Sequence, residues 1–551
     1  MVLARKKPDL WSGITIGFVL LFGIFLIYPL FGILRQSVLT PEGEFTLRHF
    51  TRFFSQAYYS QTIVNSLKVT VAITIVTLLI GIPFSYFYSF YHLKGAKALF
   101  VVSVLNCMSA PFIGAYAWIL LLGRSGVITL FFKNVLGIKL GSIYGFSGIL
   151  VVQALKLYPL VFLYMNGAFK SIDSYLLEAS ANLGTVGIRR FFRVTLGLTM
   201  PTILAASLLV FMRAIADFGT PMLIGEGFRT FPVEIYNQYL GEVGVDYNFA
   251  SAISVIAIVL TAAVFFLQKY STGKFQFSMN VTRPVEKKAP KGLRGFFMYL
   301  YCYGITAIAF MPQVYVSYLS FRNSDAAVFL EGYSLASYRQ AVDKLLVRSI
   351  NNTIILGLGA LAIIIIFSVL IAYLVVRRPG LVNNMIDSFS MLPYIMPGAI
   401  IGIAMVVAFS KPPLVLSGTM AIMIISFVIR RMPYSIRSAN AILMQIPMNI
   451  EEAAISLGSS KLKAFTKITV PMMAPGIISG AILSWVAIVT ELSSSIILYN
   501  NRNITLTMST YVAISRGSYG LACAFSAILT LLTSVSLLLY LQISKTEDIK
   551  L

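Results

Sequence analysis

Two carboxylates lie inside segments that are otherwise apolar. Asp217 stands in FMRAIADFGTP, and Glu491 stands much further along the chain in IVTELSSSIIL. A charge at the centre of a membrane-spanning helix costs about 2.5–3.5 kcal/mol even on insertion scales, so an acid retained there is a functional hypothesis by default. Oxygen ligands suit hard cations, and Ser493 and Ser494 add hydroxyls beside Glu491. These residues predict a polar path or binding site for a solute.

Each acid also has a simpler interpretation. Arg213 lies one helical turn before Asp217 and is placed to neutralise it by an ion pair. Glu491 has no basic residue within a turn, so the serine hydroxyls after it would have to hydrogen-bond it. A path that includes Arg213 and purely local pairing both stay open on this evidence.

The segments that carry these residues are long and apolar. Hydrophobic residues make up 58% of the 551 and charged residues 11%, whereas a soluble domain has about 25% charged residues. A continuous apolar run of about 20 residues spans a bilayer as a helix, whereas the strands of a membrane barrel alternate. We therefore predict an all-α integral membrane protein with about twelve transmembrane helices. The predicted spans are 11–34, 69–91, 98–123, 142–165, 194–212, 248–268, 295–320, 350–376, 388–410, 412–431, 468–490 and 517–544.

The net charge of +23 follows a membrane topology and does not indicate nucleic acid. Lysine and arginine gather in alternate connections between the spans, while the intervening connections 35–60, 220–247 and 321–348 hold nine of the 20 acids. This is the positive-inside pattern. It predicts that both termini are cytoplasmic and that the partners include membrane lipids and no nucleic acid.

The chain repeats part of its own sequence. The stretch EASANLGTVGIRRFFRVTLGLTMP, at 178–201, returns as EAAISLGSSKLKAFTKITVPMMAP at 452–475. The separation between these two copies equals the separation between the two acids, and it also pairs Lys156 with Arg430. The sequence therefore contains two parallel copies of one unit.

Each copy accounts for six of the predicted helices. We predict a first half at 1–269, a basic cytoplasmic linker at 270–294 and a second half at 295–551. Two like halves commonly enclose a transport pathway at their interface.

The repeated stretch predicts a helix, a glycine turn and a second helix at the membrane surface. Gly184 and Gly458 suit the left-handed residue that ends a helix, and Thr185 and Ser459 then offer an N-cap for the next one. A single copy would suit an amphipathic helix in the headgroup region. Two copies in register predict a symmetric surface for a partner.

These stretches resemble the EAA loop of ABC importer permeases of the binding-protein-dependent type. The fused layout is most similar to the two-half ferric-iron transport permeases. The resemblance implies two tandem six-helix type I halves whose loops, here 170–200 and 446–474, dock on ATP-hydrolysing subunits. One departure is Gly197, which stands where the second copy has Pro471. The residues that the resemblance assigns to coupling with the ATPase are Glu178, Ala179, Gly184, Glu452, Ala453 and Gly458.

The chain contains no G-x-x-x-x-G-K-[ST] phosphate-binding loop. It is therefore expected not to be an enzyme and to bind no cofactor tightly. The resemblance implies two ATP-binding-cassette subunits, expected to be identical, which use ATP on the cytoplasmic side. It also implies a periplasmic or lipid-anchored solute-binding protein and a location in the bacterial cytoplasmic (inner) membrane.

The segments ADFGTP and ELSSS resemble those of ferric-iron importer permeases. The resemblance implies ferric iron as cargo, moved by alternating access, and we hypothesise that Asp217 and Glu491 coordinate the metal directly. Importers of the same class for thiamine, polyamine or phosphonate stay open as alternatives. An ion-driven secondary transporter is the alternative from another class; it would explain buried acids but not the paired loops.

Overall fold

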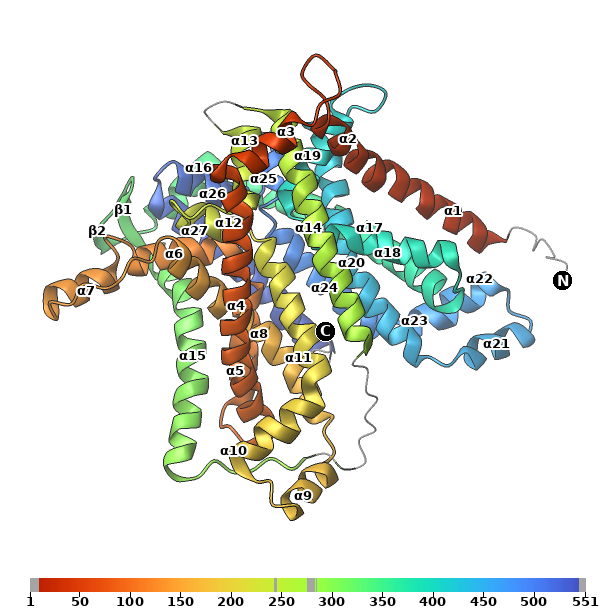
Figure 1. The fold of residues 1–551 in the computed structure, drawn as a ribbon, viewed down its shortest axis with the longest axis horizontal. Helices are drawn as coiled ribbons and strands as arrows, with labels where there is room; N and C mark the ends of the chain where they lie inside the picture. Colours follow the sequence, from red (N-terminus) through yellow and green to blue (C-terminus); the bar gives the residue numbers. More distant parts are fainter. Residues whose placement is uncertain (1–8, 242–244, 275–282, 284, 545–551) are drawn as a thin grey trace.

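The computed structural model describes residues 9–241, 245–274, 283 and 285–544 (Figure 1). The helices of the first half, of which η1 and η2 are π-helical, are α1 (Leu10–Phe22), η1 (Gly23–Ile27), α2 (Tyr28–Ser37), α3 (Arg48–Ser55), α4 (Ala57–Phe90), α5 (Ala96–Met108), α6 (Pro111–Leu122), α7 (Val127–Val135), α8 (Phe146–Lys170), α9 (Ser174–Asn182), α10 (Gly187–Arg190), η2 (Phe191–Thr195), α11 (Leu196–Ile215), α12 (Gly219–Ile224), α13 (Phe231–Leu240) and α14 (Tyr247–Lys274).

The second half adds a short antiparallel hairpin to its helices. Its elements, with η3 π-helical, are α15 (Gly292–Leu319), β1 (Arg322–Asp325), β2 (Val328–Tyr333), α16 (Ala336–Lys344), α17 (Leu346–Arg377), α18 (Leu381–Ile395), α19 (Gly398–Phe409), α20 (Met420–Gln445), α21 (Met448–Ser456), α22 (Lys461–Ala464), η3 (Phe465–Thr469), α23 (Val470–Met472), α24 (Ala474–Val489), α25 (Ser495–Leu498), α26 (Leu506–Ser515) and α27 (Tyr519–Ser544). Residues 275–282 and 284 of the predicted linker and the two chain ends, 1–8 and 545–551, lie outside the described residues.

The predicted all-α membrane fold is confirmed, with a smaller count of apolar spans. Among the described residues, nine helices are long and apolar enough to cross a membrane, or eleven if each of two bent pairs is one span. The predicted span absent from this count corresponds to α20. Every stretch of 18 residues in α20 contains Arg430, Arg431 and Arg437, so this helix is more highly charged than the apolar spans.

The predicted bounds 412–431 for this span are wrong at both ends. Pro412 and Pro413 belong to a loop, and α20 begins after Thr419, whose side chain accepts a hydrogen bond from the Ile422 amide at 3.4 Å. Proline has no N–H and fits poorly in a helix interior, so the prolines delay the helix. The arginines do not end α20, which continues to Gln445.

The third spanning helix of each half is broken, where the sequence predicted a continuous span. In the first half α5 ends and α6 restarts at Pro111, and in the second half α18 and α19 meet at 111° around Pro397. The residues before these prolines, Ala110 and Met396, have extended backbone angles. Proline disfavours the helical conformation of the residue before it, which accounts for both breaks.

The internal repeat extends to individual elements. The separation found in the sequence relates α9 to α21, α10 to α22 and η2 to η3 with matching first and last residues, and α11 matches the combined α23 and α24. One difference lies between the copies: the second is bent by 68° before Ala474, between Pro471 and Pro475, whereas the first, with Gly197 and one proline, runs on as a single span. Proline removes a helical hydrogen bond, so the pair weakens the helix at that point.

Each half packs its first helix against the other half. In α1, Trp11 stacks on Tyr373 of α17 with ring centroids 4.2 Å apart. In α15, the Gln313 amide donates to Asn106 of α5 at 3.1 Å. The core of each half is a long helix pair, α4 along α8 and α17 along α20. The exchanged helices tie the two halves together and leave α8, α11, α20 and α24 near the middle of the molecule (Figure 1).

Candidate functional site

A cavity of about 200 Å³ lies between the two halves. Its walls come from α5, α8 and α11 in the first half, from α18, α20 and α24 in the second, and from the turns that follow α11 and α24. The break points of both third helices also reach it, through Phe112 and Met396. Discontinuous helices are tolerated in a membrane where they line such a space. Six residues with acidic or basic side chains line the cavity: Lys156, Arg213, Asp217, Arg430, Arg431 and Glu491.

The repeat places matched residues on opposite sides of this cavity. Lys156 of α8 corresponds to Arg430 of α20, and Asp217 corresponds to Glu491. The sequence predicted that Asp217 and Glu491 belong to one site, and both do line this cavity. Their equivalence follows from the turn that ends α11 and α24, which the two halves form at the same position.

Glu491 is enclosed by basic groups from α20. Its side chain is 1% exposed and forms ion pairs with both Arg430 and Arg431. The amide of Ser494 donates to the same carboxylate at 3.0 Å and its hydroxyl at 3.2 Å. The hydroxyl contact expected from the sequence is therefore present, but the principal partners are two arginines that lie far from Glu491 along the chain. Ser493 lines the cavity beside them.

Asp217 has polar partners but no ion pair. Its carboxylate accepts a hydrogen bond from the Gln153 side-chain amide of α8 at 2.9 Å and from the Thr220 amide at 3.3 Å. The local ion pair with Arg213, which the sequence left open as the simpler interpretation, is absent from the described structure. The Arg213 guanidinium lies over the rings of Tyr434 and Tyr394 of the second half, 5.3 and 5.9 Å from their centroids.

Several cavity donors have no partner within the described structure. Lys156 has neither a hydrogen bond nor an ion pair there. The Nε atoms of Arg213, Arg430 and Arg431 are buried without a hydrogen-bond acceptor. No group of three or more His, Cys, Asp or Glu residues suited to a metal occurs among the described residues. Direct metal coordination by Asp217 and Glu491 stays a prediction.

Sequence reasoning missed the arginine pair and the two tyrosines. Arg430 was recognised only as the counterpart of Lys156, and Arg431 was taken as the end of a span. A usable signal was available: two adjacent arginines follow the apolar run 420–429 at the level of an intramembrane lysine in the other half. Tyr394 and Tyr434 carry no comparable signal, because aromatic residues are frequent along the whole chain.

The second part of the site is the pair of exposed helix–glycine turns at α9 and α21. Gly184 and Gly458 have positive φ angles of 78° and 90°. In each turn two backbone hydrogen bonds close the helix end. One of them joins the Thr185 amide to the Ser180 carbonyl at 2.9 Å in the first copy, and the Ser459 amide to the Ala454 carbonyl at 3.0 Å in the second. This pattern is a Schellman motif. The left-handed stop predicted from the glycines is confirmed in both copies.

The residues predicted to cap the following helices are off by one position. Val186 and Ser460 precede α10 and α22, and the Ser460 hydroxyl accepts a hydrogen bond from the Lys463 amide at 3.3 Å. Thr185 and Ser459 instead complete the Schellman turns, where their amides are used.

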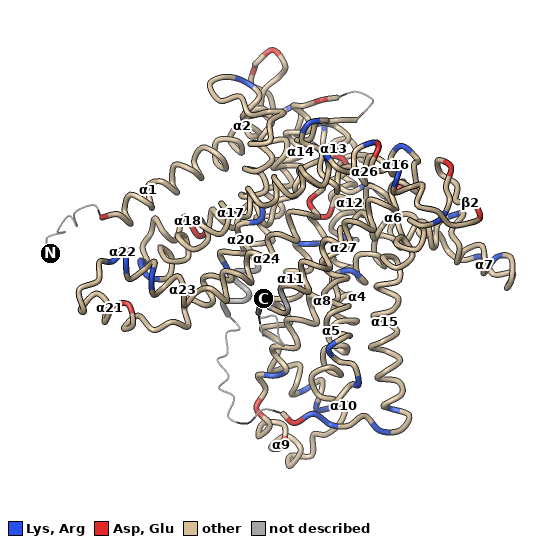
Figure 2. The backbone as a smooth tube through the Cα atoms, turned by 180° about the vertical axis from the view of Figure 1, so that it is seen from behind, with Lys and Arg blue, Asp and Glu red and all other residues tan. Residues whose placement is uncertain are grey.

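The six residues predicted for coupling are all exposed, at Glu178, Ala179, Gly184, Glu452, Ala453 and Gly458. At the tip of each turn a leucine side chain is almost fully exposed: Leu183 is 85% exposed and Leu457 is 89% exposed. The two turns project from separate places on the molecule, and basic residues surround α10 and α22 behind them (Figure 2). One neighbour is already present on the first turn, where Arg283 lies 3.7 Å from the Glu178 carboxylate.

Comparison with known families gives two matches in this chain. A model of the family described as "Binding-protein-dependent transport system inner membrane component" matches residues 81–276 and 334–545. One match falls in each half, and together they cover more than half of the chain. Each includes one helix–glycine turn and one acid of the cavity.

Individual relatives match along most of the chain. It is 28% identical over 539 residues to the "Ferric transport system permease protein FbpB" of Actinobacillus pleuropneumoniae, covering 96% of this chain and 77% of that protein. It is 29% identical over 494 residues to the "Putative ferric transport system permease protein FbpB 1" of Haemophilus influenzae, covering 87% and 76%. A bacterial ABC transporter of known structure, involved in the import of the acidic polysaccharide alginate, aligns with 49% of this chain and 96% of its own, at 18% identity and a TM-score of 0.40.

Proposed function

Because the chain belongs to the family of binding-protein-dependent transport system inner membrane components, we propose that it is the permease of an ATP-driven importer for ferric iron. Support for the cargo comes from the relatives named as ferric transport permeases, which match this chain over most of its length. In this role the chain forms the transmembrane pathway, and other subunits carry out ATP hydrolysis.

The observation that carries the proposal is the cavity between two equivalent halves. Its matched acids, Asp217 and Glu491, and its matched bases, Lys156 and Arg430, come from opposite sides of one interface. A site placed at such an interface becomes accessible from one membrane face or the other when the halves rock against each other. The cargo would therefore occupy this cavity during alternating access.

The exposed turns supply the link to ATP. We assign α9 and α21 as docking elements for two identical ATP-binding-cassette subunits, one for each turn. Leu183 and Leu457 are apolar side chains left bare at the tips, and such exposed apolar groups suit a protein interface. Beyond the Gly458 turn the chain runs through α22, η3 and α23 into α24, which ends two residues before Glu491, so a displacement of this turn would be passed on to the cavity. The first turn reaches Asp217 through α11 in the same way.

The proposed orientation follows from the distribution of charge. The turns and the linker are basic, so they and both termini are assigned to the cytoplasm of a bacterial inner membrane. The opposite face then carries α3, α13, α16 and the hairpin of β1 and β2, which we assign to a solute-binding protein that delivers the cargo.

Reconstitution tests the proposed function. The chain, purified with its co-purifying ATPase and binding protein, is placed in liposomes, and uptake of ⁵⁵Fe(III) is measured with and without internal ATP. Iron uptake that requires ATP, both partners and intact turns supports the proposal. Uptake of labelled thiamine, spermidine or phosphonate in place of iron would reassign the cargo. Uptake by the chain alone, driven by an ion gradient, would replace the importer class with a secondary transporter.

A further inference from the structure

The central cavity has more positive than negative groups. Four of its charged residues are basic, Lys156, Arg213, Arg430 and Arg431, against the two acids Asp217 and Glu491. With each group in its ordinary charge state at neutral pH, the surplus is two positive charges. A bare trivalent cation would enter this space against electrostatic repulsion.

The two carboxylates are also less available as metal ligands than their positions in the sequence indicate. The Glu491 carboxylate is held between Arg430 and Arg431 and further bonded by Ser494. The Asp217 carboxylate is engaged by Gln153 and by the Thr220 amide. A cation that used either carboxylate as a ligand would have to displace these partners.

Most of the unpaired polar groups in the cavity are donors; the exception is the acceptor Oε1 of Gln153, which is buried without a donor. Nε of Arg213, of Arg430 and of Arg431 is buried without an acceptor. Lys156 lines the same cavity and makes no hydrogen bond or ion pair in the described structure, although the Asp217 carboxylate attracts it electrostatically. Buried charged donors without partners are costly in an apolar surrounding. An anion with several oxygen atoms would satisfy them together, and guanidinium groups match carboxylate and phosphate oxygens in geometry as well as charge.

We infer that the cargo occupies this cavity as an anion: ferric iron enclosed by carboxylate or phosphate oxygens, with a net negative charge. The iron in this statement rests on the proposed function, whereas recognition of the anion rests on the cavity alone. Lys156 and the arginines contact the outer oxygens of the complex. Glu491 is a positioning residue that holds Arg430 and Arg431 at the wall, and the chelating anion supplies the ligands of the metal.

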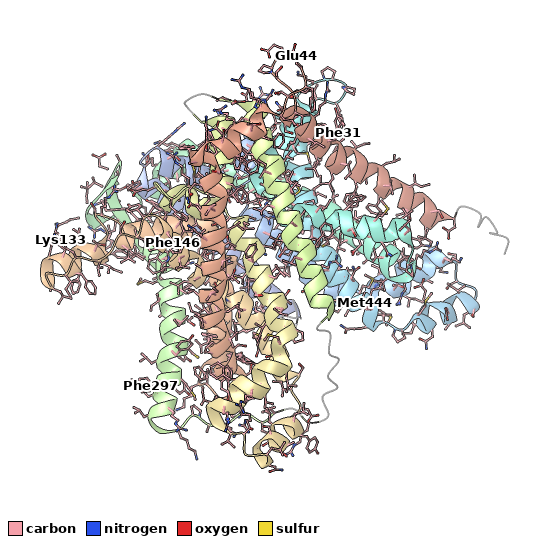
Figure 3. The ribbon with its side chains drawn as sticks, viewed as in Figure 1. Phe31, Glu44, Lys133, Phe146, Phe297 and Met444 are labelled. Atoms are coloured by element: carbon pink, nitrogen blue, oxygen red, sulfur yellow. The ribbon has the colours of Figure 1, made fainter. Side chains whose placement is uncertain are left out.

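Equilibrium binding to the purified full-length chain in nanodiscs tests anion recognition. The probes are ferric [¹⁴C]citrate for carboxylate and ferric [³²P]pyrophosphate for phosphate chemistry. Lys156→Gln should weaken binding of at least one probe about tenfold or more, the effect of removing one charge-assisted bond. Lys156→Arg should retain binding. Lys133→Gln is the matched control, since Lys133 is exposed on α7 and lies away from the helix bundle (Figure 3).

Asp217→Asn should change binding in opposite directions depending on whether the cavity recognises an anion or bare iron. Removing this negative charge should leave anion binding unchanged or strengthen it. If the carboxylates instead bind bare iron, Asp217→Asn should abolish binding of ⁵⁵Fe(III) and Lys156→Gln should improve it. That pattern, or equal binding of both anion probes by Lys156→Gln and wild type, would overturn the inference.

A dual-label uptake measurement separates this inference from the proposed function. In the reconstituted importer, ⁵⁵Fe and one labelled anion should enter liposomes together in a constant ratio. Entry of ⁵⁵Fe without either anion would refute the inference and leave the iron permease intact. If no iron enters but an anion probe still binds in a Lys156-dependent manner, the iron assignment fails and the anion site stands.

Discussion

Replacing Glu491 by alanine should leave two buried guanidinium groups without a counter-ion. The side chains of Arg430, Arg431 and Glu491 are 9%, 15% and 1% exposed, and both arginines pair with the one carboxylate. Water therefore cannot replace the lost partner without entering the interface between α20 and α24. The arginines, adjacent in the chain, would also repel each other more strongly once the carboxylate is gone.

The size of the loss follows from the burial. Removing one member of a buried ion pair costs about 3–5 kcal/mol, because an uncompensated charge is left in a poorly polarisable surrounding. Replacing a whole buried ion group with apolar residues of similar volume is often neutral or stabilising. We therefore expect Glu491→Ala to lose about 3–5 kcal/mol of unfolding free energy. The triple variant Arg430→Met, Arg431→Met and Glu491→Met should lose less than about 1 kcal/mol.

Equilibrium unfolding in mixed detergent and SDS micelles measures both variants against wild type. Glu452→Ala is the matched control, since that glutamate is exposed on α21 and makes no ion pair in the described structure; surface changes of this kind are worth about 0.5 kcal/mol or less. A loss below about 1 kcal/mol for Glu491→Ala, or a triple variant as unstable as the single one, would refute the electrostatic reasoning.

Substitutions at three further positions test the coupling turns, the exchanged helices and the contact of Arg283 with α9. Gly458→Val places a branched side chain at a φ of 90°, where an added Cβ meets nothing within 4 Å, so the cost is backbone strain of about 1–2 kcal/mol or more. ATP hydrolysis should continue while uptake falls, and Gly458→Asn should have a milder effect. Unchanged coupling of hydrolysis to uptake in both variants would contradict the assignment. Trp11→Ala removes the ring stacked on Tyr373 and should destabilise the chain by about 3–5 kcal/mol in the same unfolding assay; a loss under about 1 kcal/mol would mean that α1 does not hold the second half. Arg283→Ala breaks an ion pair at 3.7 Å whose two side chains are more than half exposed, so stability should change by less than about 1 kcal/mol; a larger change would show that the linker holds α9 in place.

The local features of this protein could be predicted from the sequence with good accuracy. The left-handed turns at Gly184 and Gly458 depend on residues close together in the chain, and the equivalence of the two halves follows from the repeated sequence. Both predictions are confirmed. The breaks at Pro111 and Pro397 are also encoded locally, by the effect of proline on the preceding residue, but the length of the apolar runs predicted continuous helices there. The apolar run that begins at Pro412 likewise predicted too early a start for α20.

The amino-acid sequence by itself determined that this is a membrane protein, that it contains a repeated unit, and that one acid lies at the same turn of each half. These properties arise from apolar length and from glycine and proline geometry, which act over a few residues. Only the tertiary structure decided which charges meet. Helix packing brings Arg430 and Arg431 to Glu491 and turns Arg213 away from Asp217 toward tyrosines of the other half, because electrostatic pairing depends on distance through space and on the rotation of each helix, neither of which spacing along the chain specifies.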